Sequence, residues 1–180
     1  VMLAFLFVRD TRRDTYELLH TKPIGSKSYI FGKVAGGLVA VVLVLVILTA
    51  GFGGMCMIHG KQASLPVDFR DMIFAAVCYV LPNLLMITSI YAGLSLLFKN
   101  PLPAVPLLFL YMIYSNMGSR GPDGRYGYYG RPLAIMVRFP GNFFDTAPPP
   151  LVVQNQISLV ISSAVLIGVA VFLWKRRRVY

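Results

Sequence analysis

The chain has 180 residues, of which 57% are hydrophobic and 13% charged, and its mean hydropathy is +0.68. Soluble domains carry about a quarter charged residues, so this composition excludes an ordinary soluble domain and indicates a membrane protein. The net charge of +10 would favour nucleic-acid binding in a soluble protein, but here the basic residues flank apolar runs, as they do at the ends of membrane helices.

Five apolar runs follow one another along the chain. The first, residues 1–8, is too short to cross a membrane, because eight helical residues rise only about 12 Å and the hydrocarbon core is about 30 Å thick. We interpret it as the end of a preceding span whose earlier part is missing from this sequence. The other four carry no Asp, Glu, Lys or Arg and predict spanning helices over 34–58, 72–98, 103–117 and 151–174.

The run 103–117 predicts the shortest of these helices. Pro101, Pro103 and Pro106 lie around its start, and proline is tolerated mainly in the first turn of a helix. Regular helix is therefore expected from about Ala104 to Met117, which is short for a full crossing. We expect this segment to tilt little or to end early as a re-entrant segment.

Basic residues divide unevenly between the two sides of the predicted spans. Eleven Lys and Arg residues fall on the side of the opening segment and the C-terminal KRRR tail, and six fall on the other side. By the positive-inside rule the first side is cytoplasmic, which places the loop 120–150 outside. The expected fold class is an all-α, polytopic transmembrane helix bundle forming one domain over 1–180, with its C-terminus in the cytoplasm.

The most polar segment, residues 9–33, lies between the opening run and the first complete span. Thr11 and Asp14 are each followed three residues later by an acid, which predicts a helix that starts there with an acidic first turn. Pro23 and Gly25 predict its end. Such a cytoplasmic helix could lie on anionic lipid headgroups or dock a protein partner, and its mixed charges favour the protein slightly.

This segment and two later ones resemble the permeases of the type-2 ABC exporter family. TYELLHTKPIGSKSYIFGK resembles that family's cytoplasmic link into the third of six spans. GLSLLFKNPLPA resembles its tight turn between the fourth and fifth spans, and the last run with its KRRR ending resembles its sixth span. The chain would then be the C-terminal two-thirds of a permease, without the first span and most of the second. RPLAIMVRFPGNFF occupies the position of that family's outer helical hairpin, which re-enters the membrane.

The resemblance implies a transmembrane subunit of an ATP-driven exporter, working as a homo- or heterodimer with two cytoplasmic ABC ATPase subunits. ATP and Mg would bind those subunits, so this chain is expected to hold no cofactor and no metal, and to bind no nucleic acid. In a bacterial cell membrane, the cytoplasmic helix would receive the motion of the ATPases through its coupling residues, which are Arg13, Asp14, Tyr16, Glu17, Leu18, Leu19 and His20.

The chain lacks the groups that would let it supply its own energy. Ion-coupled transporters usually need ionisable side chains within their spans, and the four runs have none in their interiors. The phosphate-binding pattern GxxxxGK[ST] is absent from the sequence, as are HExxH and GxSxG. Energy is therefore expected from a separate ATPase, and the chain itself is not expected to be an enzyme.

Polar side chains inside the runs mark a candidate substrate path. Asn83 lies near the middle of the run 72–98, directly after Pro82. Further polar residues follow in this run and at the outer end of the last run, and the candidate path consists of Asn83, Thr88, Tyr91, Gln154 and Gln156. Hydrogen bonding between helices, worth about 1 kcal/mol or less per contact, is the alternative role. A path of this kind would suit amphipathic molecules.

Small residues recur at every fourth position near the inner end of the first complete span, at Gly32, Gly36 and Ala40. A ridge of this kind permits close contact between helices. Packing within one subunit and a seam between two subunits both remain open as its role.

A non-transporting membrane scaffold or sensor is the alternative from another functional class. In such a protein the Tyr- and Arg-rich loop 120–150 would bind a ligand, and the inner helix would signal. Co-purification separates the two hypotheses, because an ATP-binding partner indicates the permease and a kinase or regulator indicates the scaffold or sensor.

Overall fold

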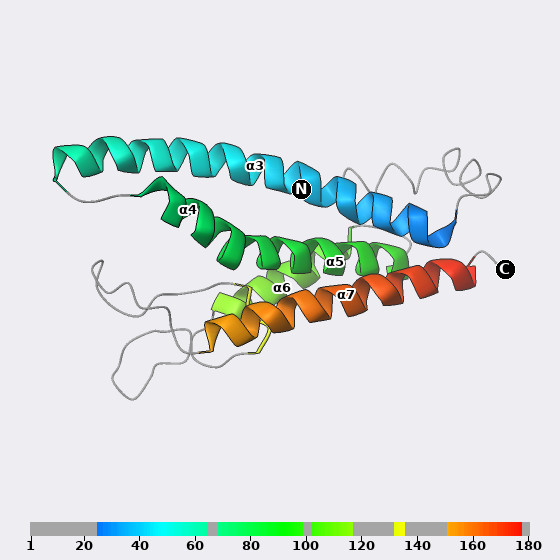
Figure 1. Ribbon diagram of the computed structural model, residues 1–180. Coiled ribbons are helices and arrows are strands. Elements are labelled where there is room, and N and C mark those ends of the chain that lie inside the picture. The colour runs from blue at the N-terminus through cyan, green and yellow to red at the C-terminus, as the bar shows by residue number, and fades with distance from the viewer. Residues whose placement is uncertain (1–24, 65–67, 99–101, 117–131, 136–150, 178–180) are drawn as a thin grey trace, which may run out of the picture.

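In the computed structural model the chain is an assembly of long helices (Figure 1). The structure describes residues 25–64, 68–98, 102–116, 132–135 and 151–177. Within these ranges every regular element is helical, and the elements are α3 (Ser26–Gln62), α4 (Phe69–Ala75), η2 (Ala76–Val80), α5 (Leu81–Phe98), α6 (Ala104–Asn116) and α7 (Val152–Arg177). The predicted all-α class is confirmed for this part of the chain.

Three of the described helices are long and apolar enough to cross a membrane. They are Ser26–Gln62, the continuous stretch Phe69–Phe98, and Val152–Arg176. Large apolar side chains such as Ile47 and Phe172 are exposed on their surfaces. An apolar surface of this extent suits lipid, and the helical backbone satisfies its own hydrogen bonds there.

The fourth predicted span is a shorter helix. α6 begins at Ala104, the start that the neighbouring prolines predicted, and it has 13 residues. At 1.5 Å per residue it measures about 20 Å, less than the roughly 30 Å of a hydrocarbon core. Four complete crossings therefore stay a prediction.

Helix α3 extends beyond the predicted span 34–58 at both ends. Its 37 residues measure about 55 Å, so its ends project past a hydrocarbon core of about 30 Å. Residues 26–33, which the sequence assigns to the cytoplasmic segment, belong to this helix. Gly25 precedes it in an extended conformation and provides no side-chain cap.

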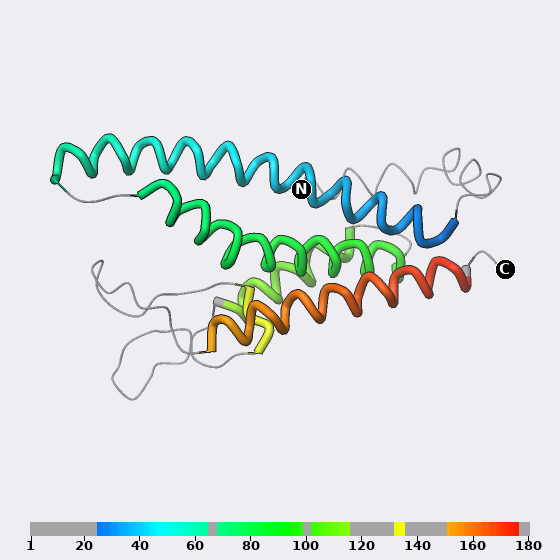
Figure 2. The backbone as a smooth tube through the Cα atoms, viewed as in Figure 1, coloured from blue at the N-terminus to red at the C-terminus, as the bar shows by residue number. Residues whose placement is uncertain are grey.

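The helix Phe69–Phe98 contains one turn of π-helix, η2, between α4 and α5. Asp68 caps the N-terminus of this helix, and its carboxylate accepts a hydrogen bond of 2.9 Å from the Arg70 backbone N–H. In the π-turn the Leu81 N–H donates to the carbonyl of Ala76, five residues back. The next residue, Pro82, has no N–H and cannot continue the ordinary ladder. The helix changes direction here, so α4 leans toward α3 while α5 lies beside α7 (Figure 2).

The packed core lies between α5 and α7. Met86 on α5 and Leu159 on α7 are buried in one cluster, where the Ser163 hydroxyl donates to the Leu159 carbonyl at 2.7 Å and lies 3.5 Å from the Met86 sulfur. A second cluster joins the start of α3 to the end of α7 through Ile30, Val34, Tyr91, Ala92, Leu96, Ala104, Ala170 and Trp174. These contacts fix α5 firmly against α7 and the first turns of α3.

Candidate functional site

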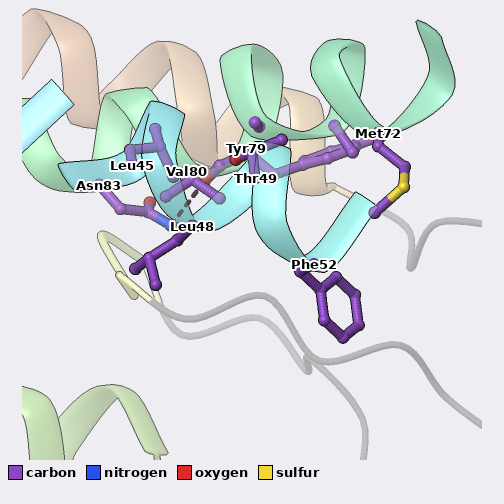
Figure 3. Close-up of a pocket in the computed structure, with 10 residues that line it drawn as sticks. Leu45, Leu48, Thr49, Phe52, Met72, Tyr79, Val80 and Asn83 are labelled. Carbon is purple, nitrogen blue, oxygen red and sulfur yellow. Dashed lines mark hydrogen bonds between the residues drawn. The ribbon is translucent and has the colours of Figure 1, made fainter. Parts of the chain in front are cut away.

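A groove of about 530 Å³ separates α3 from the first half of the helix Phe69–Phe98 (Figure 3). We call it the α3–α4 groove. It arises because α4 starts close to α3 and diverges from it up to the π-turn, and α5 approaches α3 again only toward the start of α3 (Figure 1). Its lining is mainly apolar and consists of Leu45, Leu48, Thr49, Phe52, Met72, Ala75, Ala76, Tyr79, Val80 and Asn83.

Asn83 provides the amide of this groove. Its Nδ2 donates to the Tyr79 carbonyl at 2.6 Å, the dashed line in Figure 3, so the side chain caps the backbone at the π-turn. Its Oδ1 is buried and has no hydrogen-bond partner. An unsatisfied acceptor in an apolar site costs about 1–3 kcal/mol, which makes this oxygen a receptive partner for a hydroxyl or amide N–H.

Thr49 connects this groove to a second cavity between the same two helices. The second cavity measures about 370 Å³ and is lined by Val42, Leu45, Val46, Thr49, Ala50, Phe69, Ile73, Ala76, Val77 and Leu81. Leu45, Thr49 and Ala76 line both cavities. The contact between α3 and α4 therefore has incompletely filled space on both sides of these three residues.

A tight contact between α3 and α4 lies next to the groove, at Gly53. A Cβ added to this glycine would lie 2.5 Å from Cε2 of Phe69 and 3.4 Å from Sδ of Met72. Its neighbour Gly54 has no atom within 4 Å of an added Cβ. Only glycine fits at position 53 without displacing the Phe69 ring, so this residue sets how closely α4 approaches α3.

Thr88 and Tyr91, two residues of the predicted path, lie in the core. Thr88 is fully buried and its hydroxyl donates to the Leu84 carbonyl at 2.7 Å, four residues back on the same helix. Ser95 bonds to the Tyr91 carbonyl in the same way at 2.7 Å. The hydroxyls of Thr88 and Ser95 are thus satisfied within α5, instead of by the bonds between helices that were the alternative.

The polar residues at the start of α7 have different surroundings. Gln154 is exposed. Gln156 is buried, and neither atom of its amide has a hydrogen-bond partner. Asn155, between these two glutamines, donates from Nδ2 to the Ala134 carbonyl at 2.8 Å. Of the predicted path residues, Asn83 lines the α3–α4 groove, and a common path for all five stays a prediction.

A short part of the predicted outer loop, residues 132–135, is held against the bundle. The Tyr111 hydroxyl donates to the Leu133 carbonyl, and the Ile135 N–H donates to the Ser115 hydroxyl at 3.2 Å. Leu133 adopts a left-handed backbone conformation with φ of 63°. We call this segment with its partners on α6 and α7 the loop anchor. The sequence signals for it are Tyr111 and Asn155, polar groups in apolar helices that need partners.

In the predicted ridge of small residues on α3, the two glycines have no other described residue packed against them. Gly32 and Gly36 are exposed on α3, and an added Cβ would meet nothing within 4 Å at either position. Ala40 is half-buried. Gly53, further along α3, does make such a close contact.

The predicted coupling residues precede the part of the chain that the structure describes, so their role stays a prediction; they are Arg13, Asp14, Tyr16, Glu17, Leu18, Leu19 and His20. Among the described residues there is no group of three or more His, Cys, Asp or Glu side chains that could hold a metal ion.

Long apolar helices with an exposed apolar surface suited to lipid define a multi-pass α-helical membrane protein. A comparison with protein families matches residues 3–124 to the ABC-2 family transporter proteins. This match covers most of the chain, so the protein belongs to the ABC-2 transporter family, as its resemblance to the permeases predicted. Comparisons with curated proteins and with solved structures gave no match.

Proposed function

We propose that this chain is the transmembrane subunit of an ATP-driven ABC exporter and forms its substrate path. The family match over residues 3–124 carries this proposal, because it covers α3 through α6 and the polar segment before α3. The described helices also keep their ionisable side chains near their ends, so energy has to come from outside the spans.

In this proposal the energy comes from cytoplasmic ATPase subunits that bind ATP and Mg, while this chain pairs with a second permease subunit. The segment containing Glu17 and Leu18 receives their motion, and α3, which continues from Ser26, transmits it. The chain lies in a bacterial cell membrane with its C-terminus in the cytoplasm. Amphipathic molecules suit the α3–α4 groove, because its apolar walls surround one amide acceptor.

Coupling of the ATPase tests this function. The chain is co-expressed with the ATPase subunit that co-purifies with it, and the complex is reconstituted in vesicles. Glu17→Ala or Leu18→Asp is expected to lower transport-coupled ATPase activity at least severalfold with normal membrane insertion. Lys61→Ala, at the opposite end of α3, is the matched control and should leave the activity unchanged.

Unchanged coupling in both Glu17→Ala and Leu18→Asp would contradict the assignment of that segment. Co-purification with a kinase or another regulator, and with no ATP-binding subunit, would contradict the exporter and support a non-transporting scaffold or sensor. Both outcomes are measured on the same purified sample.

A further inference from the structure

An aromatic pair joins the start of α3 to the end of α7. The rings of Tyr29 and Trp174 are stacked, with centroids 4.2 Å apart and planes inclined by 19°. The Lys33 ammonium lies 5.6 Å from the Tyr29 ring centroid, within the range of a cation–π contact. Trp174 is also part of the core cluster that contains Ile30 and Val34. The pair therefore marks the boundary where an apolar core meets the ends of two helices.

Exposed cations lie on the same helix turns as this pair. Lys27 on the first turn of α3, and Lys175 and Arg176 on the last turns of α7, are exposed. Figure 1 shows the start of α3 and the end of α7 at the same end of the bundle. The acids among the described residues, Asp68 and Asp71, lie at the start of α4, at the opposite end. The described groups at the aromatic end thus give it a positive potential.

We propose that Lys27, Tyr29, Trp174, Lys175 and Arg176 form a binding site for the phosphate headgroup of an anionic phospholipid. Tyrosine and tryptophan favour the depth of the lipid headgroups, and basic residues near a membrane surface each contribute about 1 kcal/mol of attraction to anionic lipid. Here both kinds of side chain come from two helices that the Tyr29–Trp174 stack holds together. We call this the Tyr29–Trp174 site.

The position of the site favours lipid over a soluble anion or an acidic protein. Trp174 is 8% exposed and packs in the apolar core, while the next two residues are exposed cations. The change from apolar to cationic side chains thus occurs within a single helical turn. That spacing matches the boundary between acyl chains and headgroups, where a lipid presents its phosphate directly above its apolar part.

The tryptophan content of the chain allows a direct measurement, because Trp174 is the single tryptophan of the sequence. The full chain is reconstituted in vesicles that contain brominated phosphatidylcholine mixed with either brominated phosphatidylglycerol or its unbrominated form. Bromine quenches tryptophan fluorescence at short range, so the quenching reports which lipid occupies the position beside Trp174. The expected result is that the anionic lipid is preferred about fivefold over the zwitterionic one.

Charge variants show whether the preference belongs to this site. The double variant Lys175→Gln with Arg176→Gln is expected to lower the preference below about twofold, and Lys27→Gln should lower it partially. Lys61→Gln, at the opposite end of α3, is the matched control and should keep the full preference. High salt should reduce the preference of the parent chain, because screening weakens exposed charge contacts.

Three results would overturn the proposal. Equal quenching by the two lipids would show that the site does not select anionic lipid. An undiminished preference in both the double variant and Lys27→Gln would place the selection elsewhere. Loss of the preference on adding inorganic phosphate at the lipid headgroup concentration, or on adding the ATPase subunit, would assign the site to a soluble anion or to a protein contact.

Discussion

The helix Phe69–Phe98 belongs to two parts of the molecule that differ in their packing. We call α5 together with α6, α7 and the loop anchor the core half of the molecule, and α4 together with α3 the groove half. In the core half, Met86, Thr88 and Leu159 are buried, and the Thr88 hydroxyl bonds within its own helix. In the groove half, α4 meets α3 closely at Gly53 and leaves two cavities beside that contact. A single helix thus combines a fixed half with a half that has room to move.

The π-turn explains how one helix serves both halves. η2 and Pro82 interrupt the regular hydrogen bonding between α4 and α5, and Asn83 satisfies the Tyr79 carbonyl at this point. Single π-turns inside α-helices are frequent at functional sites. The direction of α4 can therefore change at this turn without disturbing the packing of α5 on α7.

The largest effect is expected from Gly53→Val. The added side chain would overlap the Phe69 ring, and overpacking of this kind costs about 1–3 kcal/mol. Thermal unfolding of the purified chain, followed by circular dichroism, should show a lower midpoint. Gly54→Val is the matched control, because its Cβ meets nothing within 4 Å and valine is the better helix former.

Phe69→Ala sharpens this test. Combined with Gly53→Val, it removes the ring that the valine would meet, so most of the lost stability should return. A double variant as unstable as the sum of the two single variants would show that the Gly53–Phe69 contact does not control the approach of α4 to α3.

A smaller effect is expected from Asn155→Leu in the core half. The substitution removes the donor to the Ala134 carbonyl together with the buried, unsatisfied Oδ1 of Asn155, so the net destabilisation should be about 1 kcal/mol. Gln154→Leu, one residue earlier and exposed, should change the unfolding midpoint little. Equal midpoints for the two variants would contradict the role of Asn155 in the loop anchor.

Asn83→Leu should separate stability from activity. It removes the bond to the Tyr79 carbonyl together with the unsatisfied Oδ1, so the two changes in folding free energy offset each other to within about 1 kcal/mol. Coupled ATPase activity of the reconstituted complex is nevertheless expected to fall about fivefold, equivalent to about 1 kcal/mol. Thr88→Val should keep full activity, because that hydroxyl bonds within its own helix. Equal losses in both variants would contradict a special role for the groove.

The smallest effect, and a stabilising one, is expected at the start of α7. Leu151 has φ of 69° and an exposed side chain, and a residue other than glycine in this conformation costs about 1 kcal/mol. Leu151→Gly should therefore raise the unfolding midpoint slightly. Leu151→Ala shortens the side chain but keeps the Cβ, so it should give no such gain.

Helix type and approximate position could be predicted from the sequence, because long apolar runs allow few alternatives in lipid. The start of α6 at Ala104 followed from proline chemistry. The π-turn was not predicted, since Pro82 indicates a disturbance of the helix but not its form. Helices that are apolar all round also give no periodic pattern to show which face is buried.

The details of the site depend on contacts between distant parts of the chain. Gly51, Gly53 and Gly54 are alike in the sequence, and only the position of Phe69 distinguishes Gly53 from the others. Asn83 could be chosen from the sequence because an amide in an apolar run needs a partner. Its groove could not be predicted, because the groove depends on the angle between α3 and α4.

The π-turn also makes the pairing of α3 with α4 depend on chain length. A π-turn is equivalent to one extra residue in an α-helix, and each residue of an α-helix turns the chain by about 100°. Removing one residue from η2 would replace the π-turn by an α-helical turn and rotate α4 by about that angle relative to α5. Phe69 and Met72 would then point away from Gly53, although no side chain in the contact had changed. Homologues with a one-residue deletion at this turn would therefore need a different surface on α3.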